Sequence, residues 1–343
     1  MTSTGKAILR ADGDHQIGLG HIYRIRALGC ALSVTGRQVV YVTLGGTAGE
    51  RLLRETDLPI FTVEDRNSPY VPADVLDTFD PDVVLLDVLD CDGSLLKALK
   101  KSTDARLIVM DDTKAGLECA DVAINAIVAQ HGAYSTDGIQ AALYEGPAYM
   151  ILNSDVAKVV RRDGTKVDQA RKILLSFGGT DTHNVTERML DALNGVPDTF
   201  DIRVSLGPAS EPSDHLEKIA AASSHNVHIL HEVPSLIAEF AAADLVICAG
   251  GISLYELAAI GVPAAAIASE PHEVDTIRYC AAHGTCLDLG WERDMDFSLA
   301  AIAVTALAAD PSARRDMAQK GPALVDGQGL RRCVELISES LNQ

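Results

Sequence analysis

Short aliphatic segments alternate with helix-like segments along almost the whole chain, and this alternation constrains the fold more than any other feature of the sequence. The strand-like segments form a first series at 7–11, 39–44, 59–63, 83–87, 106–111 and 122–126. A second series follows at 172–177, 201–206, 226–230, 244–249, 263–268 and 285–290. Helices are expected near 21–35, 47–55, 72–79, 93–102, 183–194, 212–223, 234–242, 253–260, 272–283, 296–308 and 327–341. Strands that alternate with helices indicate parallel sheets covered on both faces, so the sequence predicts a doubly wound α/β protein.

A charged stretch without periodicity separates the two series, and 343 residues are enough for two domains. We predict an N-terminal Rossmann-like domain at 1–155, a linker at 156–171 and a C-terminal Rossmann-like domain at 172–343. The last helix could pack back on the N-terminal domain. Because ligands of such sheets bind beyond the carboxyl ends of the strands, we expect the following loops to line a central cleft between the domains.

Net charge and cysteine pattern narrow the class of protein. A net charge of −19 argues against general nucleic-acid binding, because no basic excess is present to neutralise phosphates. The seven cysteines are dispersed without a CxxC pair, which is typical of reduced intracellular thiols. The sequence shows no apolar signal core and no uncharged membrane span. We therefore expect a cytoplasmic protein, and the sequence leaves its oligomeric state open.

Three glycine-bearing loops follow expected strands and open expected helices: 17–21 (IGLGH), 177–181 (FGGTD) and 248–256 (CAGGISLYE). One such loop could simply make a tight turn, but three at equivalent places favour an anionic ligand with a diphosphate, held by backbone N–H groups. The residues expected to bind it are Gly18, Gly20, Arg24, Gly178, Gly179, Thr180, Asp181, Gly250, Gly251, Ile252, Ser253 and Glu256. His272 and Glu273 are expected to contact a sugar, and His183 to lie near the ligand.

Ser253 and Glu256 allow two interpretations. Their Ser-x-x-Glu spacing is that of a capping box at the start of a helix. Alternatively, the Ser253 hydroxyl binds a phosphate oxygen and the Glu256 carboxylate binds ribose hydroxyls, as an acidic residue does in dinucleotide sites.

His21 is the candidate general base. It stands at the expected start of a helix, with Arg24 one turn further on the same face. The helix N-terminus and the arginine both disfavour imidazolium, so we expect a neutral ring that can accept a proton. Asp12 and Asp14 share the loop with His21, and either could orient the imidazole or a substrate hydroxyl. The simpler alternative is a histidine that is only hydrogen-bonded within a loop.

Metal and nicotinamide sites are not expected. The tripeptide DCD at 90–92 is isolated and reads as a solvated turn, and the remaining histidines lack the spacing of metal ligands. The first glycine loop has no third glycine, which disfavours a dinucleotide site. We therefore predict no cofactor.

These motifs resemble those of a known family. RADGDHQIGLGHIYRIRAL at 10–28 is similar to the opening signature of the UDP-sugar hydrolases of pseudaminic acid biosynthesis and of related spore-coat polysaccharide proteins. The similarity continues in the same order through 110–126, 144–152, LLSFGGTD, GGISLYELAAIGVPAAAIA and LVDGQG at 324–329.

The resemblance implies a GT-B-like fold and a UDP-sugar substrate. It implies that His21 activates a water that attacks the anomeric carbon with inversion, and that Gly250, Gly251, Ser253 and Glu256 hold the nucleotide. One base suffices for this chemistry, because UDP is a leaving group that needs little protonation.

The leading hypothesis from the sequence is therefore a UDP-sugar hydrolase acting on an amino or deoxy sugar. The first alternative is an inverting GT-B glycosyltransferase with an alcohol or amine acceptor, and the second is a non-catalytic nucleotide-sugar-binding subunit. Asn153, Tyr255 and the segment 269–276 depart from the family pattern. The identity of the sugar therefore stays open.

Overall fold

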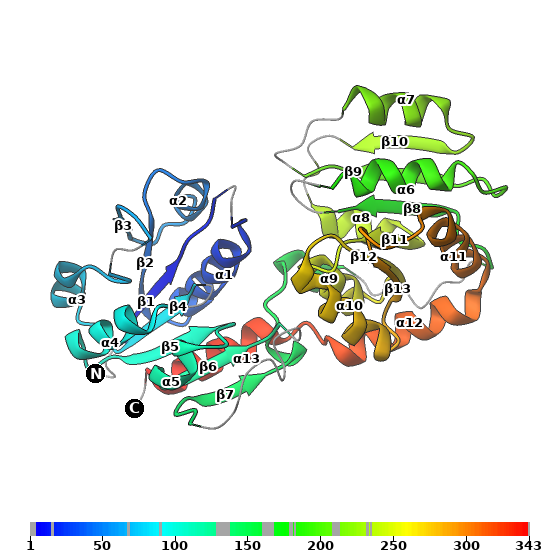
Figure 1. Ribbon diagram of the computed structural model, residues 1–343. Coiled ribbons are helices and arrows are strands. Elements are labelled where there is room, and N and C mark those ends of the chain that lie inside the picture. Colours follow the sequence, from blue (N-terminus) through cyan, green and yellow to red (C-terminus); the bar gives the residue numbers. More distant parts are fainter. Residues whose placement is uncertain are drawn as a thin grey trace. The chain divides into compact units, whose positions relative to one another are not determined.

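The computed structural model contains two compact units, each built on one parallel sheet (Figure 1). Unit 1 comprises Met1–Ile151 and Gln328–Gln343, and unit 2 comprises Leu152–Gly327. The structure describes residues 5–14, 17–66, 69–88, 91–127, 138–159, 168–177, 181, 183–207, 213–230, 233 and 235–341. The prediction of two doubly wound sheets is confirmed.

The sheet of unit 1 has the strand order β3-β2-β1-β4-β5-β6-β7 within the described residues, and every neighbouring pair is parallel. Its strands are β1 (Lys6–Ala11), β2 (Gln38–Leu44), β3 (Ile60–Val63), β4 (Val83–Asp87), β5 (Arg106–Met110), β6 (Val122–Asn125) and β7 (Ala142–Glu145). Its helices are α1 (Gly20–Val34), α2 (Ala48–Leu53), α3 (Ala73–Phe79), α4 (Gly93–Ser102), α5 (Ala115–Cys119), the short 3₁₀ helix η2 (Pro147–Tyr149) and α13 (Gly329–Ser340).

Both faces of this sheet are buried. Successive residues of β1 belong to different cores: Leu9 packs with α1 residues such as Ile25, whereas Ile8 packs in the core that contains Leu96 of α4. Strands covered on both faces are continuously apolar, which explains why the strand-like segments stood out in the sequence.

The sheet of unit 2 has the order β10-β9-β8-β11-β12-β13 within the described residues, again with parallel pairs. Its strands are β8 (Lys172–Ser176), β9 (Asp201–Ser205), β10 (Asn226–Leu230), β11 (Leu245–Cys248), β12 (Ala264–Ala268) and β13 (Leu287–Trp291). Its helices are η3 (Ser154–Lys158), α6 (Val185–Leu193), α7 (Asp214–Ala222), α8 (Leu236–Ala242), α9 (Ile252–Ile260), α10 (Pro271–Ala282), α11 (Phe297–Ala309) and α12 (Pro311–Leu324). The predicted linker lies partly outside the described residues.

Each sheet has a point where the strand order reverses. In unit 1 this point lies between β1 and β4, and in unit 2 it lies between β8 and β11. The loops that leave the carboxyl ends of these strands diverge, which is where doubly wound sheets bind their ligands. All three glycine-bearing loops follow strands at these two points.

The sequence patterns did not predict β7, α5 and α12, nor the short 3₁₀ helices η2 and η3. The apolar periodicity of α12 is weak, because its sequence is polar and contains Gly321 and Pro322. Its start nevertheless carries a recognisable signal, since the carboxylate of Asp310 accepts hydrogen bonds from two first-turn amides and Pro311 stands at the first helical position. A Cβ on Gly321 would lie 2.4 Å from the Ala258 carbonyl oxygen, so this glycine permits the close packing of α12 against α9.

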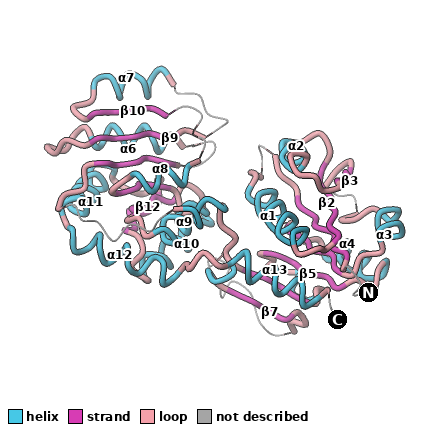
Figure 2. The backbone as a smooth tube through the Cα atoms, turned by 180° about the vertical axis from the view of Figure 1, so that it is seen from behind, coloured by secondary structure: helices cyan, strands magenta, loops and turns pink. Residues whose placement is uncertain are grey.

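The C-terminal helix α13 lies in unit 1, where it packs against α1 and η2 (Figure 2). Cys333 and Ile337 of α13 join the core formed by α1 and β1. The helix begins at Gly329, and a Cβ built there would lie 2.0 Å from the carbonyl oxygen of Met150. The start of α13 therefore requires a residue without a side chain.

Substitution Gly329→Ala should destabilise unit 1 by about 1–3 kcal/mol, because the added methyl group overpacks a backbone contact. Gly45→Ala is the matched control, since a Cβ there meets its nearest atom at an ordinary 3.4 Å. Urea unfolding of the two variants and the wild type measures the difference. Equal unfolding midpoints for the two variants would contradict the assigned contact.

Candidate functional site

His21 lies at the strand-order reversal of unit 1, at the second position of α1. Its Nδ1 is 2.7 Å from Oδ1 of Asp87, the last residue of β4. Asp87 pairs in register with Ala11, the last residue of β1, so its carboxylate is presented where α1 begins. The His21 side chain keeps about a fifth of its surface exposed, while Asp87 is fully buried.

The charge state of Asp87 decides which ring nitrogen of His21 carries the proton. Burial would raise the pKa of Asp87, but the neighbouring Arg24 guanidinium and His21 outweigh this effect and hold the pKa below its ordinary value. An ionised carboxylate only accepts hydrogen bonds, so the proton between the two groups belongs to Nδ1. In the neutral imidazole, Nε2 is then left with a lone pair, as a general base requires.

Arg24, which the sequence predicts to bind substrate, is held by carboxylates of the protein itself. Its side chain is 4% exposed, and its guanidinium is bound by Asp87 and by Asp111, which directly follows β5. The buried guanidinium would by itself have a lowered pKa, but the two carboxylates raise that pKa above its usual value. A guanidinium enclosed in this way does not support the predicted contact with substrate.

The predicted role of Asp12 or Asp14 in orienting His21 is filled by Asp87. Asp12 is buried, forms an ion pair with Arg10 and accepts the Leu44 amide at 2.7 Å. Asp14 accepts the Ile17 amide at 3.2 Å and pairs with Arg66. These bonds hold the loop in front of α1. Contact of either carboxylate with a substrate hydroxyl stays a prediction.

The loop before α1 needs its glycines for shape. Gly18 has φ +76°, a conformation that side chains rarely adopt, and a Cβ on Gly13 would lie 2.4 Å from Ile22 Cγ1. Gly20 is the first residue of α1.

In unit 2, the start of α9 has the polar groups expected for an anion site. Gly251 is the N-cap, Ile252 and Ser253 are the first two helical residues, and no side chain caps the helix. The capping-box interpretation of Ser253 and Glu256 is therefore wrong, because Ser253 lies inside the helix. Within the described residues, the Ser253 hydroxyl has no hydrogen-bond partner. It is free to meet a ligand.

Glu256 is buried in the second turn of α9, with 8% of its surface exposed. Its Oε1 accepts the Asn153 backbone amide at 3.3 Å, and the structure describes no hydrogen bond to its other oxygen. Burial raises the pKa of Glu256 to about 7, although the Asn153 amide opposes the shift. A carboxyl group that is partly protonated near neutral pH can both donate to and accept from a hydroxyl pair.

Other predicted ligand residues have structural partners. A Cβ on Gly250 would lie 2.8 Å from Glu273 Cβ, so this glycine lets the loop pack on α10. The Asp181 carboxylate accepts the amides of Val185 and Thr186, both at 2.9 Å, and thereby closes the N-terminus of α6.

The Glu273 carboxylate accepts the Glu270 amide at 3.2 Å in a capping box that starts α10, and it also accepts the Ser269 amide at 2.8 Å. His272 is exposed beside it. Nε2 of His183 lies 3.5 Å from Oε1 of Glu270, and its Nδ1 lies 3.7 Å from Oε1 of Glu292. The predictions for Gly178, Gly179 and Thr180 fall outside the described residues.

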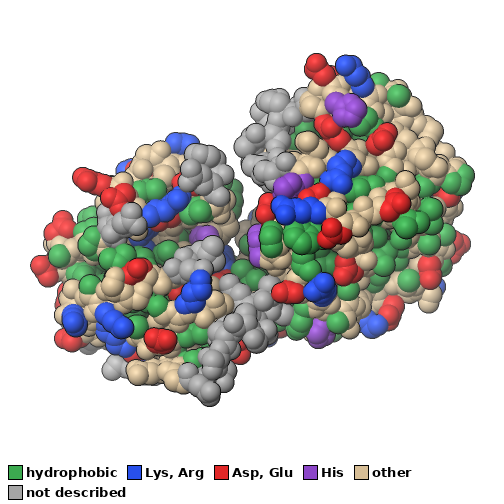
Figure 3. Space-filling view, viewed as in Figure 1, with side chains coloured by type: hydrophobic (Ala, Val, Ile, Leu, Met, Phe, Trp, Pro, Cys, Tyr) green, Lys and Arg blue, Asp and Glu red, His purple; other side chains and the backbone are tan. Residues whose placement is uncertain are grey.

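In the described part of the chain, no group of three or more His, Cys, Asp or Glu side chains could hold a metal ion. No helix in that part is both long and apolar enough to cross a membrane. Acidic and basic side chains are interspersed on the face shown in Figure 3.

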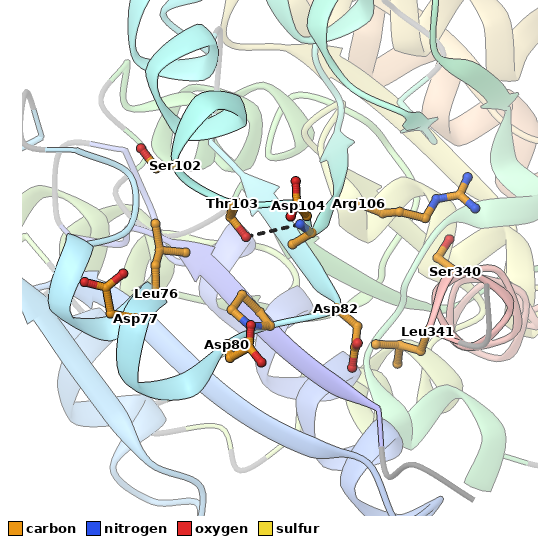
Figure 4. Close-up of a pocket in the computed structure, with 12 residues that line it drawn as sticks. Leu76, Asp77, Asp80, Asp82, Ser102, Thr103, Asp104, Arg106, Ser340 and Leu341 are labelled. Atoms are coloured by element: carbon orange, nitrogen blue, oxygen red, sulfur yellow. Dashed lines mark hydrogen bonds between the residues drawn. The ribbon is translucent and has the colours of Figure 1, made fainter.

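A pocket of about 540 Å³ lies in unit 1 (Figure 4). It is lined by residues at the amino ends of β4 and β5, among them Asp82, Asp104 and Arg106, and by the end of α13. Since ligands of parallel sheets bind at the carboxyl ends, this pocket is not the candidate site.

Comparisons with known proteins agree with this architecture. The chain is 25% identical to the spore coat polysaccharide biosynthesis protein SpsG of Bacillus subtilis (strain 168), over 97% of this chain and 98% of that protein. It is 27% identical to the UDP-N-acetylglucosamine--N-acetylmuramyl-(pentapeptide) pyrophosphoryl-undecaprenol N-acetylglucosamine transferase of Anaeromyxobacter sp. (strain Fw109-5), over 51% of this chain and 47% of that enzyme. The crystal structure of Acinetobacter baumannii MurG superposes with a TM-score of 0.75 and 16% identity, covering 98% of this chain and 99% of that chain. No family model matches the sequence.

The fold is GT-B. The predicted GT-B-like architecture is thus confirmed, and the chain is glycosyltransferase-like in structure.

Substitution Glu256→Gln should change how stability depends on pH. A carboxyl group whose pKa is raised by folding stabilises the protein fully below its ordinary value of 4.5, and this stabilisation is lost as pH rises through about 7. The glutamine variant lacks this loss, so it should match the wild type at pH 4.5 and exceed it by about 3 kcal/mol at pH 8.

Urea unfolding at both pH values measures this difference. Glu339→Gln, at an exposed position on α13, is the control and should follow the wild type. If the free energies of unfolding of Glu256→Gln and wild type differed by the same amount at both pH values, the raised pKa of Glu256 would be contradicted.

Proposed function

We propose that the protein is an inverting glycosyltransferase that uses a nucleotide-sugar donor, with UDP as the nucleotide. The observation that carries the proposal is the hydrogen bond between His21 and the buried, ionised Asp87 at the strand-order reversal of unit 1. The names of the relatives support it, since one similar protein is a UDP-N-acetylglucosamine-dependent transferase.

The start of α9 supplies groups that suit the nucleotide. The first-turn amides of a helix favour a phosphate, and the free Ser253 hydroxyl adds a donor beside them. The Glu256 carboxyl group, with one oxygen held by Asn153, suits a ribose diol. The first-turn amides and the Ser253 hydroxyl stabilise the negative charge that grows on the diphosphate as it departs.

His21 supplies the proton transfer. Its unprotonated Nε2 takes the proton of the acceptor hydroxyl or amine as that atom forms a bond to the anomeric carbon. The bond between this carbon and the diphosphate oxygen breaks, UDP leaves with the electron pair, and the configuration at carbon inverts. Asp87 stabilises the imidazolium through Nδ1–H and keeps the ring oriented.

Transfer and hydrolysis differ only in the acceptor. The sequence motifs placed hydrolysis first, whereas the relatives and similar structures favour transfer. The same base serves either nucleophile, so hydrolysis and the specific link to pseudaminic acid remain predictions that an assay decides.

Purified protein should release UDP from one of a panel of UDP-sugars only when an acceptor is added. Candidate acceptors are sugar hydroxyls, amino sugars and lipid-linked sugars, and coupled detection of UDP measures the rate. UDP release at the same rate without an acceptor would establish hydrolysis instead. Binding of UDP without turnover of any donor would favour the non-catalytic subunit.

Substitution His21→Asn should lower kcat by about 10²- to 10⁴-fold, which is the usual contribution of a general base. Its Kd for UDP should stay within about twofold of wild type, because the nucleotide is assigned to α9. Ser253→Ala and Glu256→Ala should instead weaken UDP binding, as measured by calorimetry. His228→Asn, on an exposed side chain of β10, is the control for loss of a histidine. Full activity of His21→Asn would refute the assigned base.

A further inference from the structure

Arg24 is enclosed by carboxylates on both sides. Its Nε lies 2.9 Å from Asp87 Oδ2, its Nη2 donates to Asp87 Oδ1, and its Nη1 donates to Asp111 Oδ2. Asp111 in turn accepts the amides of Ala126 and Ile127 at 2.8 and 3.0 Å, so its position is fixed by the backbone that follows β6. The planar fork of a guanidinium can satisfy this arrangement, whereas the single nitrogen of a lysine cannot.

The same guanidinium reaches the ring of His21. Nη2 lies 3.0 Å from Nδ1, and Asp87 Oδ1 lies 2.7 Å from the same ring nitrogen. The guanidinium can only donate and the ionised carboxylate can only accept, so the two contacts favour opposite tautomers. The tautomer that His21 adopts therefore depends on the charge and orientation of the Asp87 carboxylate, and Arg24 controls both.

Asp111 belongs to the same arrangement. It accepts a hydrogen bond from Nη1 of Arg24, while Nε and Nη2 of the guanidinium face Asp87.

We infer that Arg24, held between Asp87 and Asp111, is a positioning residue that fixes His21 in the Nδ1–H tautomer. The consequence for turnover rests on the proposed function, whereas the tautomer itself does not. Arg24 therefore acts through Asp87 and His21, without contact with substrate.

The test is ¹⁵N NMR of the histidine rings in the full-length protein, together with kinetics. The His21 signals are assigned among the ten histidines by their loss in His21→Gln. In the wild type, Nδ1 should carry the proton and Nε2 should show the shift of an unprotonated nitrogen. Arg24→Lys should convert a substantial fraction of the ring to the Nε2–H tautomer. It should also lower kcat at least about 10-fold, a part of the usual contribution of a base, with the donor KM within about twofold.

Asp111→Asn is the second variant, because its side chain keeps the size of aspartate and is expected to preserve the fold. It should shift the tautomer in the same direction by a smaller amount. Arg314→Lys is the matched control: this arginine is fully buried in unit 2 and donates to the carbonyls of Leu307 and Ala308. Arg314→Lys should leave the His21 signals unchanged, and circular dichroism verifies the fold of each variant.

The inference is overturned if wild-type His21 is mainly the Nε2–H tautomer, or if Arg24→Lys and Asp111→Asn fold and both keep the wild-type signals. A tautomer shift with an unchanged kcat would support the positioning role and refute the proposed base. If no donor is turned over by the wild type, the proposed function fails while the NMR result still decides the inference.

Discussion

The hydrogen bond between His21 and Asp87 depends on one topological constraint, the reversal of strand order between β1 and β4. In a parallel sheet the carboxyl ends of all strands lie at the same end of the sheet. Where the strand order reverses, the connections that follow the two adjacent strands leave toward opposite faces of the sheet. Helix α1 therefore starts beside the end of β4. This geometry lets a residue in the first turn of a helix meet a carboxylate 66 positions later in the chain.

The reversal of strand order also explains why charged side chains are buried at the carboxyl ends of these strands. Asp87 ends β4 and Asp111 directly follows the neighbouring β5, and two carboxylates side by side in a buried place would repel each other. Arg24 lies one turn after His21 on α1 and forms an ion pair with each of them. Removing Arg24 would leave two buried carboxylates without their cation, which costs more than the intact cluster contributes. The cluster is thus a rigid support for a single, partly exposed imidazole.

Most of the fold could be predicted from the sequence because buried parallel strands are continuously apolar and their helices alternate with them. The prediction missed α12, because its polar sequence shows only a weak apolar periodicity. It also missed β7, because none of its four residues is fully buried. The candidate base was found from local features: the glycines and the start of α1. Asp87 was not assigned as its partner, because the pairing of β1 with β4 is a long-range property. Sequence proximity favoured Asp12 and Asp14, which instead hold the loop.

Arg24 shows the limit of inference from residue type. An arginine near a glycine loop suggests a phosphate ligand. In the structure, however, the guanidinium of Arg24 is bound by two carboxylates that lie far from it in the sequence. At α9 the reverse occurred: Ser253 and Glu256 have the spacing of a capping box, yet the helix starts at Ile252, one residue before Ser253, and leaves both side chains without that role. A local pattern therefore identifies groups that can bind anions, and only the tertiary partners decide which of them remain available. By that criterion, Nε2 of His21, the Ser253 hydroxyl and one oxygen of Glu256 are side-chain atoms to which the described residues supply no hydrogen-bond partner.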